Sequence, residues 1–89
     1  MAIVKIPTPL RNLTENKTEI QMNGRTIIEL IENLDSMYTG IKDKILENGK
    51  LKHFVNVYVN GEDIRYIDSL ETTINNNDEI SIVPAVAGG

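Results

Sequence analysis

The 89 residues are enough for one domain, and a domain of this size leaves little room for a buried active site. The absence of cysteine excludes disulfides, thiolate catalysis and iron–sulfur ligation. A formal net charge of −4, with three tyrosines and one phenylalanine, disfavours nucleic-acid binding and favours a partner with a basic surface. The sequence shows neither an apolar run long enough to span a membrane nor an export signal, so we expect a cytoplasmic location.

Two short strands are expected at the start of the chain. Residues 2–7 alternate like a strand, and the prolines that follow from Pro7 indicate its exit or a sheet edge. Residues 11–16 are polar and turn-like. Residues 18–22 alternate as a second strand, which the turn signal at residues 23–24 closes.

The main helix has the clearest pattern in the chain. Thr26 and Glu29 form a capping box. Apolar residues then recur at helical spacing on one face: Ile27, Leu30, Ile31, Leu34 and Tyr38. Gly40 is expected to end this helix, and residues 41–46 predict a short second helix that residues 48–49 stop.

The second half of the chain predicts three more strands. Residues 54–59 form a clear strand, the Asn-Gly pair at 60–61 predicts a hairpin, and residues 62–66 should return antiparallel. Residues 75–78 are a polar turn, and residues 79–83 form the last strand. This order predicts an α+β, β-grasp (ubiquitin-like) fold, in which a mixed sheet of four to five strands wraps around one main helix.

No catalytic or metal-binding constellation is visible. His53 is the only histidine and is more typical of a surface or packing residue than of a base. The acidic pairs at 62–63 and 78–79 are better explained by solvation at turns, because adjacent strand residues point to opposite faces. Arg65 is expected to be a solvated strand charge or a contact for an acidic partner surface. The chain is not expected to be an enzyme.

The chain ends in Gly88-Gly89, which offers a thin thread with nothing flanking the terminal carbonyl carbon. We expect residues 1–84 to form the domain and residues 85–89 a flexible reactive tail, with an extended reach of about 17 Å. The carboxylate of Gly89 is ionised at neutral pH and is a poor electrophile. It needs activation by another protein, most simply as an acyl adenylate made from ATP. A frayed end of small residues is the alternative.

Apolar residues near the tail are candidates for partner docking. Pro84 fixes φ and removes a donor, so it ends the last strand and directs the tail away from the sheet. Val83, Val86, Phe54 and Tyr58 are expected to form an apolar docking patch. Core packing explains Phe54 equally well.

Several motifs along the whole chain resemble the ubiquitin-like sulfur carrier proteins. The most specific are Ile6-Pro7-Thr8 with Leu10-Arg11, Tyr38-Thr39-Gly40-Ile41, residues 54–60 with Glu62-Asp63-Ile64-Arg65, and residues 82–89. This family includes the small subunit of molybdopterin synthase, a carrier of the thiamine pathway, and the carrier of thiocarboxylate-dependent cysteine synthesis. Together these motifs look most like the cysteine branch. Val83 departs from the molybdopterin carriers, which often have a bulky aromatic residue at this position.

The resemblance implies a specific chemistry at Gly89. An ATP-dependent activating enzyme would adenylate this residue, and sulfur would then replace an oxygen to give a thiocarboxylate. A partner synthase would accept the sulfur. In the cysteine branch the acceptor is an activated serine on a pyridoxal-phosphate enzyme, and a metal-dependent peptidase then releases the cysteine; a related use in homocysteine formation is an option. The chain itself would bind no cofactor or metal, because the partner enzyme uses the ATP.

Three other functions stay open at this point. The small subunit of molybdopterin synthase would use the same Pro84-to-Gly89 tail. A ubiquitin-like protein modifier would join Gly89 to lysine amines through isopeptide bonds. A non-covalent binding module would make no chemical use of the two glycines.

Overall fold

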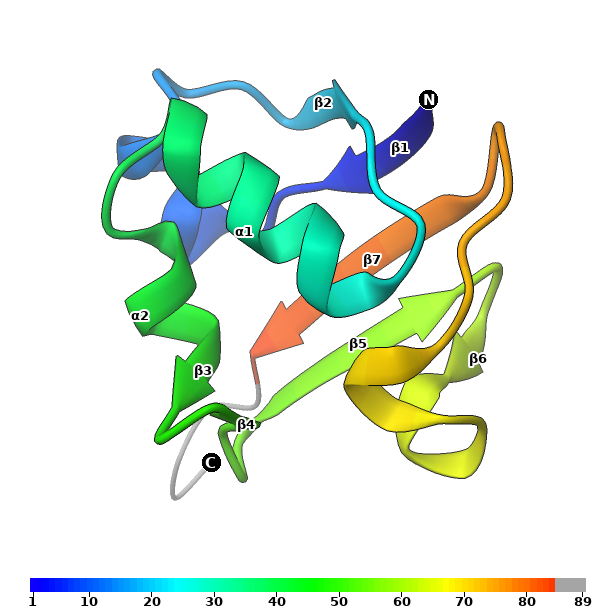
Figure 1. Cartoon of the computed structure of the whole chain (residues 1–89). Coiled ribbons are helices and arrows are strands. Elements are labelled where there is room, and N and C mark those ends of the chain that lie inside the picture. The colour runs from blue at the N-terminus through cyan, green and yellow to red at the C-terminus, as the bar shows by residue number, and fades with distance from the viewer. Residues whose placement is uncertain (85–89) are drawn as a thin grey trace.

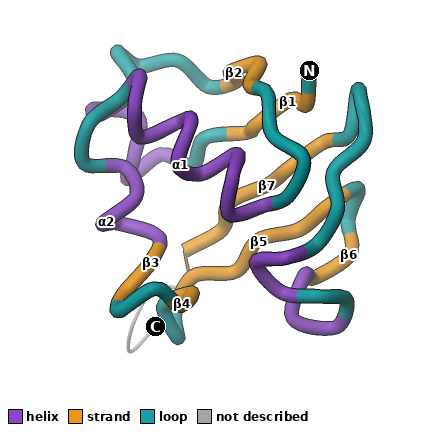
Figure 2. The backbone as a smooth tube through the Cα atoms, viewed as in Figure 1, coloured by secondary structure: helices purple, strands orange, loops and turns teal. Residues whose placement is uncertain are grey.

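The computed structural model describes residues 1–84, so the expectations for Val86, Gly88 and Gly89 lie outside it. Seven strands, two α-helices and three short 3-10 helices are assigned in this part of the chain (Figures 1 and 2). In chain order they are β1 (Ala2–Lys5), η1 (Thr8–Leu13), β2 (Glu19–Met22), α1 (Ile27–Met37), α2 (Ile41–Ile45), β3 (Leu46–Glu47), β4 (Lys50–Leu51), β5 (Val55–Val59), β6 (Glu62–Asp63), η2 (Ile64–Tyr66), η3 (Ser69–Glu71) and β7 (Glu79–Pro84).

Five strands form one mixed sheet in the order β2-β1-β7-β5-β6, and α1 crosses one face of it (Figure 1). The pairing of β1 with β7 is parallel, and the other pairings in this sheet are antiparallel. The strands β3 and β4 form a separate two-stranded hairpin. This arrangement confirms the predicted β-grasp fold, with a sheet of five strands and one main helix.

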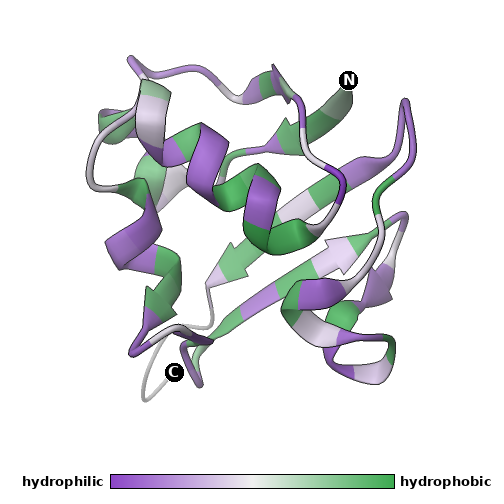
Figure 3. Cartoon of the chain, in the orientation of Figure 1, coloured by the Kyte–Doolittle hydropathy of each residue, from purple (hydrophilic) through white to green (hydrophobic). Residues whose placement is uncertain are grey.

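The core lies between α1 and the sheet. Alternate residues of the strands face the helix, so Val4, Val57 and Ile80 are almost fully buried, as are Leu30 and Leu34 of α1. Figure 3 shows hydrophobic residues along the central strands and a hydrophilic loop leading into β7. Burial of these apolar side chains supplies most of the free energy of folding.

The capping box at the start of α1 forms with one change of partner. The Thr26 side-chain oxygen accepts a hydrogen bond from the backbone N–H of Glu29 at 3.3 Å, as predicted. The Glu29 carboxylate reaches one residue further back, where it accepts from the N–H of Arg25 at 3.2 Å. Both bonds satisfy backbone donors at the helix entrance.

A polar contact joins the segment before β2 to the end of α1. Lys17 Nζ donates a hydrogen bond to the Tyr38 hydroxyl at 3.1 Å and lies 3.8 Å from a carboxylate oxygen of Glu15. The hydrogen bond and the charge interaction with Tyr38, and then Glu15, raise the pKa of Lys17 above its ordinary value.

Four short segments differ from the sequence-based expectations. The supposedly turn-like segment at 11–16 begins as the end of η1. The strand beginning at Ala2 ends at Lys5, so the prolines mark its exit, but the alternative of a sheet edge is wrong because the strand is paired on both sides. Asn48-Gly49, predicted to stop a helix, forms the turn of the β3–β4 hairpin with φ of 54° and 76°. The strand expected at 62–66 stops at Asp63, whose carboxylate accepts from the Arg65 N–H at 2.9 Å and starts a 3-10 turn.

Candidate docking site at the end of β7

The last strand ends beside the start of β5. Val55 is the Cα partner of Pro84, and Asn56 is the partner of Val83. This end of β7 lies at the same end of the molecule as the β3–β4 hairpin (Figure 1). Any segment that continues from Pro84 therefore starts next to these elements.

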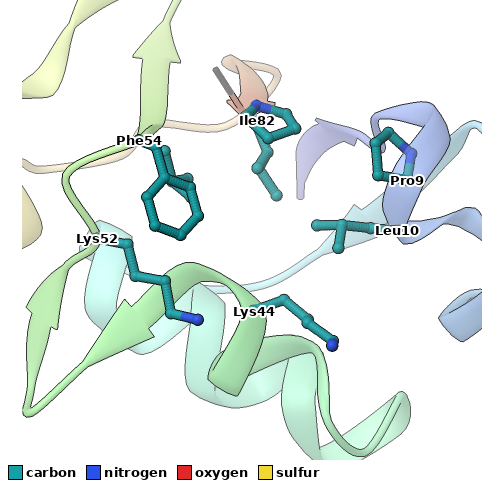
Figure 4. A pocket seen from close by; sticks show the side chains of 8 residues that line it. Pro9, Leu10, Lys44, Lys52, Phe54 and Ile82 are labelled. Atoms are coloured by element: carbon teal, nitrogen blue, oxygen red, sulfur yellow. The ribbon is translucent and has the colours of Figure 1, made fainter. Parts of the chain in front are cut away.

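A cleft of about 340 Å³ opens where β7 ends, and we call it the tail-base cleft. Its walls come from four separate parts of the chain: Pro9, Leu10, Lys44, Lys52, Phe54, Val55, Ile82 and Pro84. Figure 4 shows Phe54 on one side of the cleft and Pro9 and Leu10 on the other. Because most of the lining is apolar, the cleft suits an apolar side chain of a partner.

A second cleft of about 490 Å³ also borders Pro84. It is lined by Lys5, Ile6, Pro7, Thr8, Pro9, Arg11, Ser81, Ile82, Val83 and Pro84. The two clefts share Pro9, Ile82 and Pro84, so together they surround the end of β7 with largely apolar surface.

The structure brings some of the predicted docking residues together and separates one. Phe54 is 48% exposed, so it is a surface residue, and it shares the tail-base cleft with Pro84. Val83 is 43% exposed and lines the second cleft. Tyr58 lies further along β5, with Ser81 as its Cα partner, and neither cleft includes it. A docking role for each of these residues remains a prediction.

The tail-base cleft also contains residues that were not predicted from the sequence as docking residues. Pro9 and Leu10 belong to η1, whereas Lys44 lies on α2 and Lys52 follows β4. Lys52 Nζ lies 5.8 Å from the centroid of the Phe54 ring, which is the geometry of a cation–π contact. No local pattern signals this group, because tertiary folding alone assembles it.

Arg65 is exposed, as expected of a solvated charge, but it lies in η2 and not on a strand, and it also has a structural role in this region. Its guanidinium donates to the carbonyl oxygens of Lys52 and Val55, both at 2.9 Å, and to the side-chain oxygen of Asn56 at 2.6 Å. The Val55 N–H also donates to the Lys52 carbonyl, at 3.1 Å, and closes a tight turn. Arg65 therefore fixes the turn that presents Phe54.

Residues 1–84 hold no group of three or more histidine, cysteine or acidic side chains arranged to bind a metal ion. His53 is exposed beside the cleft region. Across the same span, each helix is too short or too polar to cross a membrane. The described site is largely apolar and is bordered by lysines.

The sheet order, the single helix across it and the strand end set between two apolar clefts define a ubiquitin-like, β-grasp protein. The chain belongs to the ThiS family, which it matches over residues 4–89. It is 42% identical to the sulfur carrier protein CysO of Mycobacterium tuberculosis over 89 aligned positions, covering 97% of this chain and 96% of the relative.

Solved structures agree with this assignment. A chain of the BexX/CysO complex of Amycolatopsis orientalis superimposes with a TM-score of 0.96 and 40% identity, with all of both chains covered. The small archaeal modifier protein 1 of Methanosarcina acetivorans superimposes with a TM-score of 0.85 and 32% identity, covering 99% of this chain and 95% of that one.

Proposed function

We propose that this protein is a sulfur carrier that delivers sulfide as a thiocarboxylate on Gly89. The observation that carries the proposal is the ThiS family match, which runs to residue 89 and so includes the terminal glycines. The 42% identity to CysO along nearly the whole chain supports it. In this role the protein is a co-substrate of other enzymes and not a catalyst.

The chemistry takes place in two steps on a partner enzyme. The carboxylate oxygen of Gly89 attacks the α-phosphorus of ATP, and pyrophosphate leaves to give an acyl adenylate. A sulfur nucleophile at the level of hydrosulfide, supplied by the partner system, then attacks the carbonyl carbon and AMP leaves. The product is a terminal thiocarboxylate. The glycines suit this reaction because they let the reacting carbon enter a narrow active site.

The described surface supplies the docking for this reaction. Val83, Pro84 and Phe54 line the two clefts around the end of β7 and would contact the body of the activating enzyme, and Val86 would extend this contact. Tyr58 would contribute from the open face of the sheet. The match to a chain of a two-protein complex supports such a docked state.

We further propose cysteine synthesis as the destination of the sulfur, on the strength of the similarity to CysO. In the cytoplasm, a pyridoxal-phosphate-dependent synthase would bind an activated serine, and the thiocarboxylate sulfur of Gly89 would bond to the β-carbon of that serine as its activating group leaves. The Gly89 acyl group would then move from the sulfur to the amine of the new cysteine and form an amide bond. A metallopeptidase would then hydrolyse the bond between Gly89 and the new cysteine. Formation of homocysteine and of molybdopterin are the competing destinations.

The test combines the purified chain, the activating enzyme of its own organism, Mg-ATP and a sulfide source. Intact-mass spectrometry should show a species heavier by the difference between sulfur and oxygen, located at Gly89 and lost on treatment with a thiol-alkylating reagent. Deletion of Gly89 should abolish this species, whereas Met37→Ala, a change on the exposed side of α1, should leave it intact. Absence of both adenylate and thiocarboxylate with the wild-type chain would refute the proposal.

A role as a protein modifier is a second candidate, and the structural match to the archaeal modifier supports it. In that role an amine of a lysine attacks the same adenylate and AMP leaves. Cells would then contain covalent adducts of this chain on other proteins, and these adducts would disappear when Gly89 is deleted.

A further inference from the structure

The rim of the tail-base cleft carries positive charge. Figure 4 shows the side chains of Lys44 and Lys52 along one border of the cleft, with the apolar side chains around the rest. Lys50 and His53 line an adjoining hollow together with Lys52, and Glu47 is its one acidic lining residue. The linings of these two hollows thus hold three lysines against one glutamate, although the whole chain has a net charge of −4.

The two lysines on the rim are not neutralised within residues 1–84. Three other lysines, Lys5, Lys17 and Lys42, each lie within 4.0 Å of a glutamate carboxylate. Neither Lys44 nor Lys52 has such a partner in the described chain. Uncompensated charges next to an apolar hollow attract a surface of opposite charge and give little stability to the fold itself.

We infer that the tail-base cleft is the docking surface for an acidic patch on the activating enzyme, in which carboxylates face Lys44 and Lys52 and an apolar side chain enters between Phe54 and Leu10. This inference rests on the proposed function. The net charge of the chain predicts a partner with a basic surface, whereas the tail-base cleft predicts an acidic one.

Distance identifies protein carboxylates, and not ATP phosphates, as the partners of the lysines. The five residues after Pro84 reach about 17 Å when extended. When Gly89 lies in the adenylation site, the tail-base cleft is therefore at the entrance of that site. Charges at an entrance steer association and fix orientation, so they act on complex formation more than on the chemical step.

The experiment measures ATP–pyrophosphate exchange by the activating enzyme as a function of carrier concentration. We compare the wild type with the double variant Lys44→Glu/Lys52→Glu, and with Lys42→Glu/Arg25→Glu, which changes the net charge equally but lies outside the cleft lining. Far-UV circular dichroism verifies that each variant is folded. The cleft variant should raise the apparent KM about tenfold or more with kcat nearly unchanged. High salt should raise the apparent KM of the wild type toward that of the cleft variant, because it screens the charges.

The outcomes separate the inference from the proposed function. If the wild type supports exchange and the KM of the cleft variant is within about twofold of the wild-type KM, the assignment of the docking surface is wrong and the carrier function stands. An equal effect of the control variant would mean that only net charge matters, which also overturns the inference. A wild-type dimer in sedimentation that the cleft variant abolishes would assign the cleft to a second copy. No exchange with the wild type would refute the function and the docking surface together.

Discussion

Replacement of Arg65 by alanine is expected to loosen the turn that carries Phe54. The guanidinium makes three hydrogen bonds, to the carbonyl oxygens of Lys52 and Val55 and to the side chain of Asn56. Alanine removes all three donors at once. Lysine keeps the charge but not the planar fork, so Arg65→Lys should fall between alanine and the wild type.

The expected loss of stability in Arg65→Ala is about 1–2 kcal/mol. A hydrogen bond from a charged donor contributes about 1.5–3 kcal/mol, and less where water reaches it, as it does at the exposed Arg65. The freed carbonyl oxygens can bind water in the variant, which also lowers the loss. Fixing the arginine side chain in the folded state costs up to about 2 kcal/mol of rotamer entropy, which offsets part of the stabilisation that the hydrogen bonds give.

Urea unfolding followed by circular dichroism measures the change in unfolding free energy, and hydrogen exchange reports on the turn itself. The Val55 amide, which donates to the Lys52 carbonyl, should exchange faster in Arg65→Ala. Arg25→Ala is the control, because the Arg25 side chain makes no hydrogen bond or ion pair inside residues 1–84. A loss below about 0.5 kcal/mol together with unchanged exchange at Val55 would refute the structural role of Arg65.

Two further changes test other parts of the fold. Gly24→Ala should destabilise the protein by about 1–2 kcal/mol, because the added Cβ would lie 2.7 Å from the Leu30 Cα. This overpacking outweighs the gain of about 0.4–1 kcal/mol from a stiffer unfolded chain. A variant as stable as the wild type in urea would contradict this prediction. Lys17→Met should be less stable than the wild type at neutral pH. Since the folded state raises the pKa of Lys17, its contribution is complete below the unfolded pKa of about 10.4 and is lost as the pH rises through the folded value. Urea unfolding from neutral to strongly alkaline pH should show the difference shrinking, and a constant difference would disprove the role of Lys17.

The long elements were predictable because their signals are local. Thr26 and Glu29 mark the start of α1, and the apolar residues that follow repeat with the period of a helix, so that Leu30 and Leu34 face the core. The alternation in β5 and β7 likewise determines which side chains point inward. These patterns depend on neighbours a few residues apart and do not require knowledge of the rest of the chain.

The short elements were predicted less well because distant residues decide them. Asn48-Gly49 adopts positive φ angles that suit both a helix end and a hairpin turn, and the pairing of Leu46 with Leu51 selects the hairpin. The strand that starts at Glu62 ends early because the Asp63 side chain caps a 3-10 turn, after which Arg65 binds back to the turn before β5.

The sequence by itself determined the β-grasp fold, since burial of the helix and strand faces leaves few other arrangements. Its resemblance to sulfur carriers led to the prediction that Gly89 is the reactive residue. Only the tertiary structure decided the nature of the surface next to the tail. Lys44 and Lys52 are separated along the chain by other residues and show no cluster there, yet in the folded chain both line one cleft beside the end of β7. Charge acts through space and not along the chain, so this basic rim becomes visible only after folding.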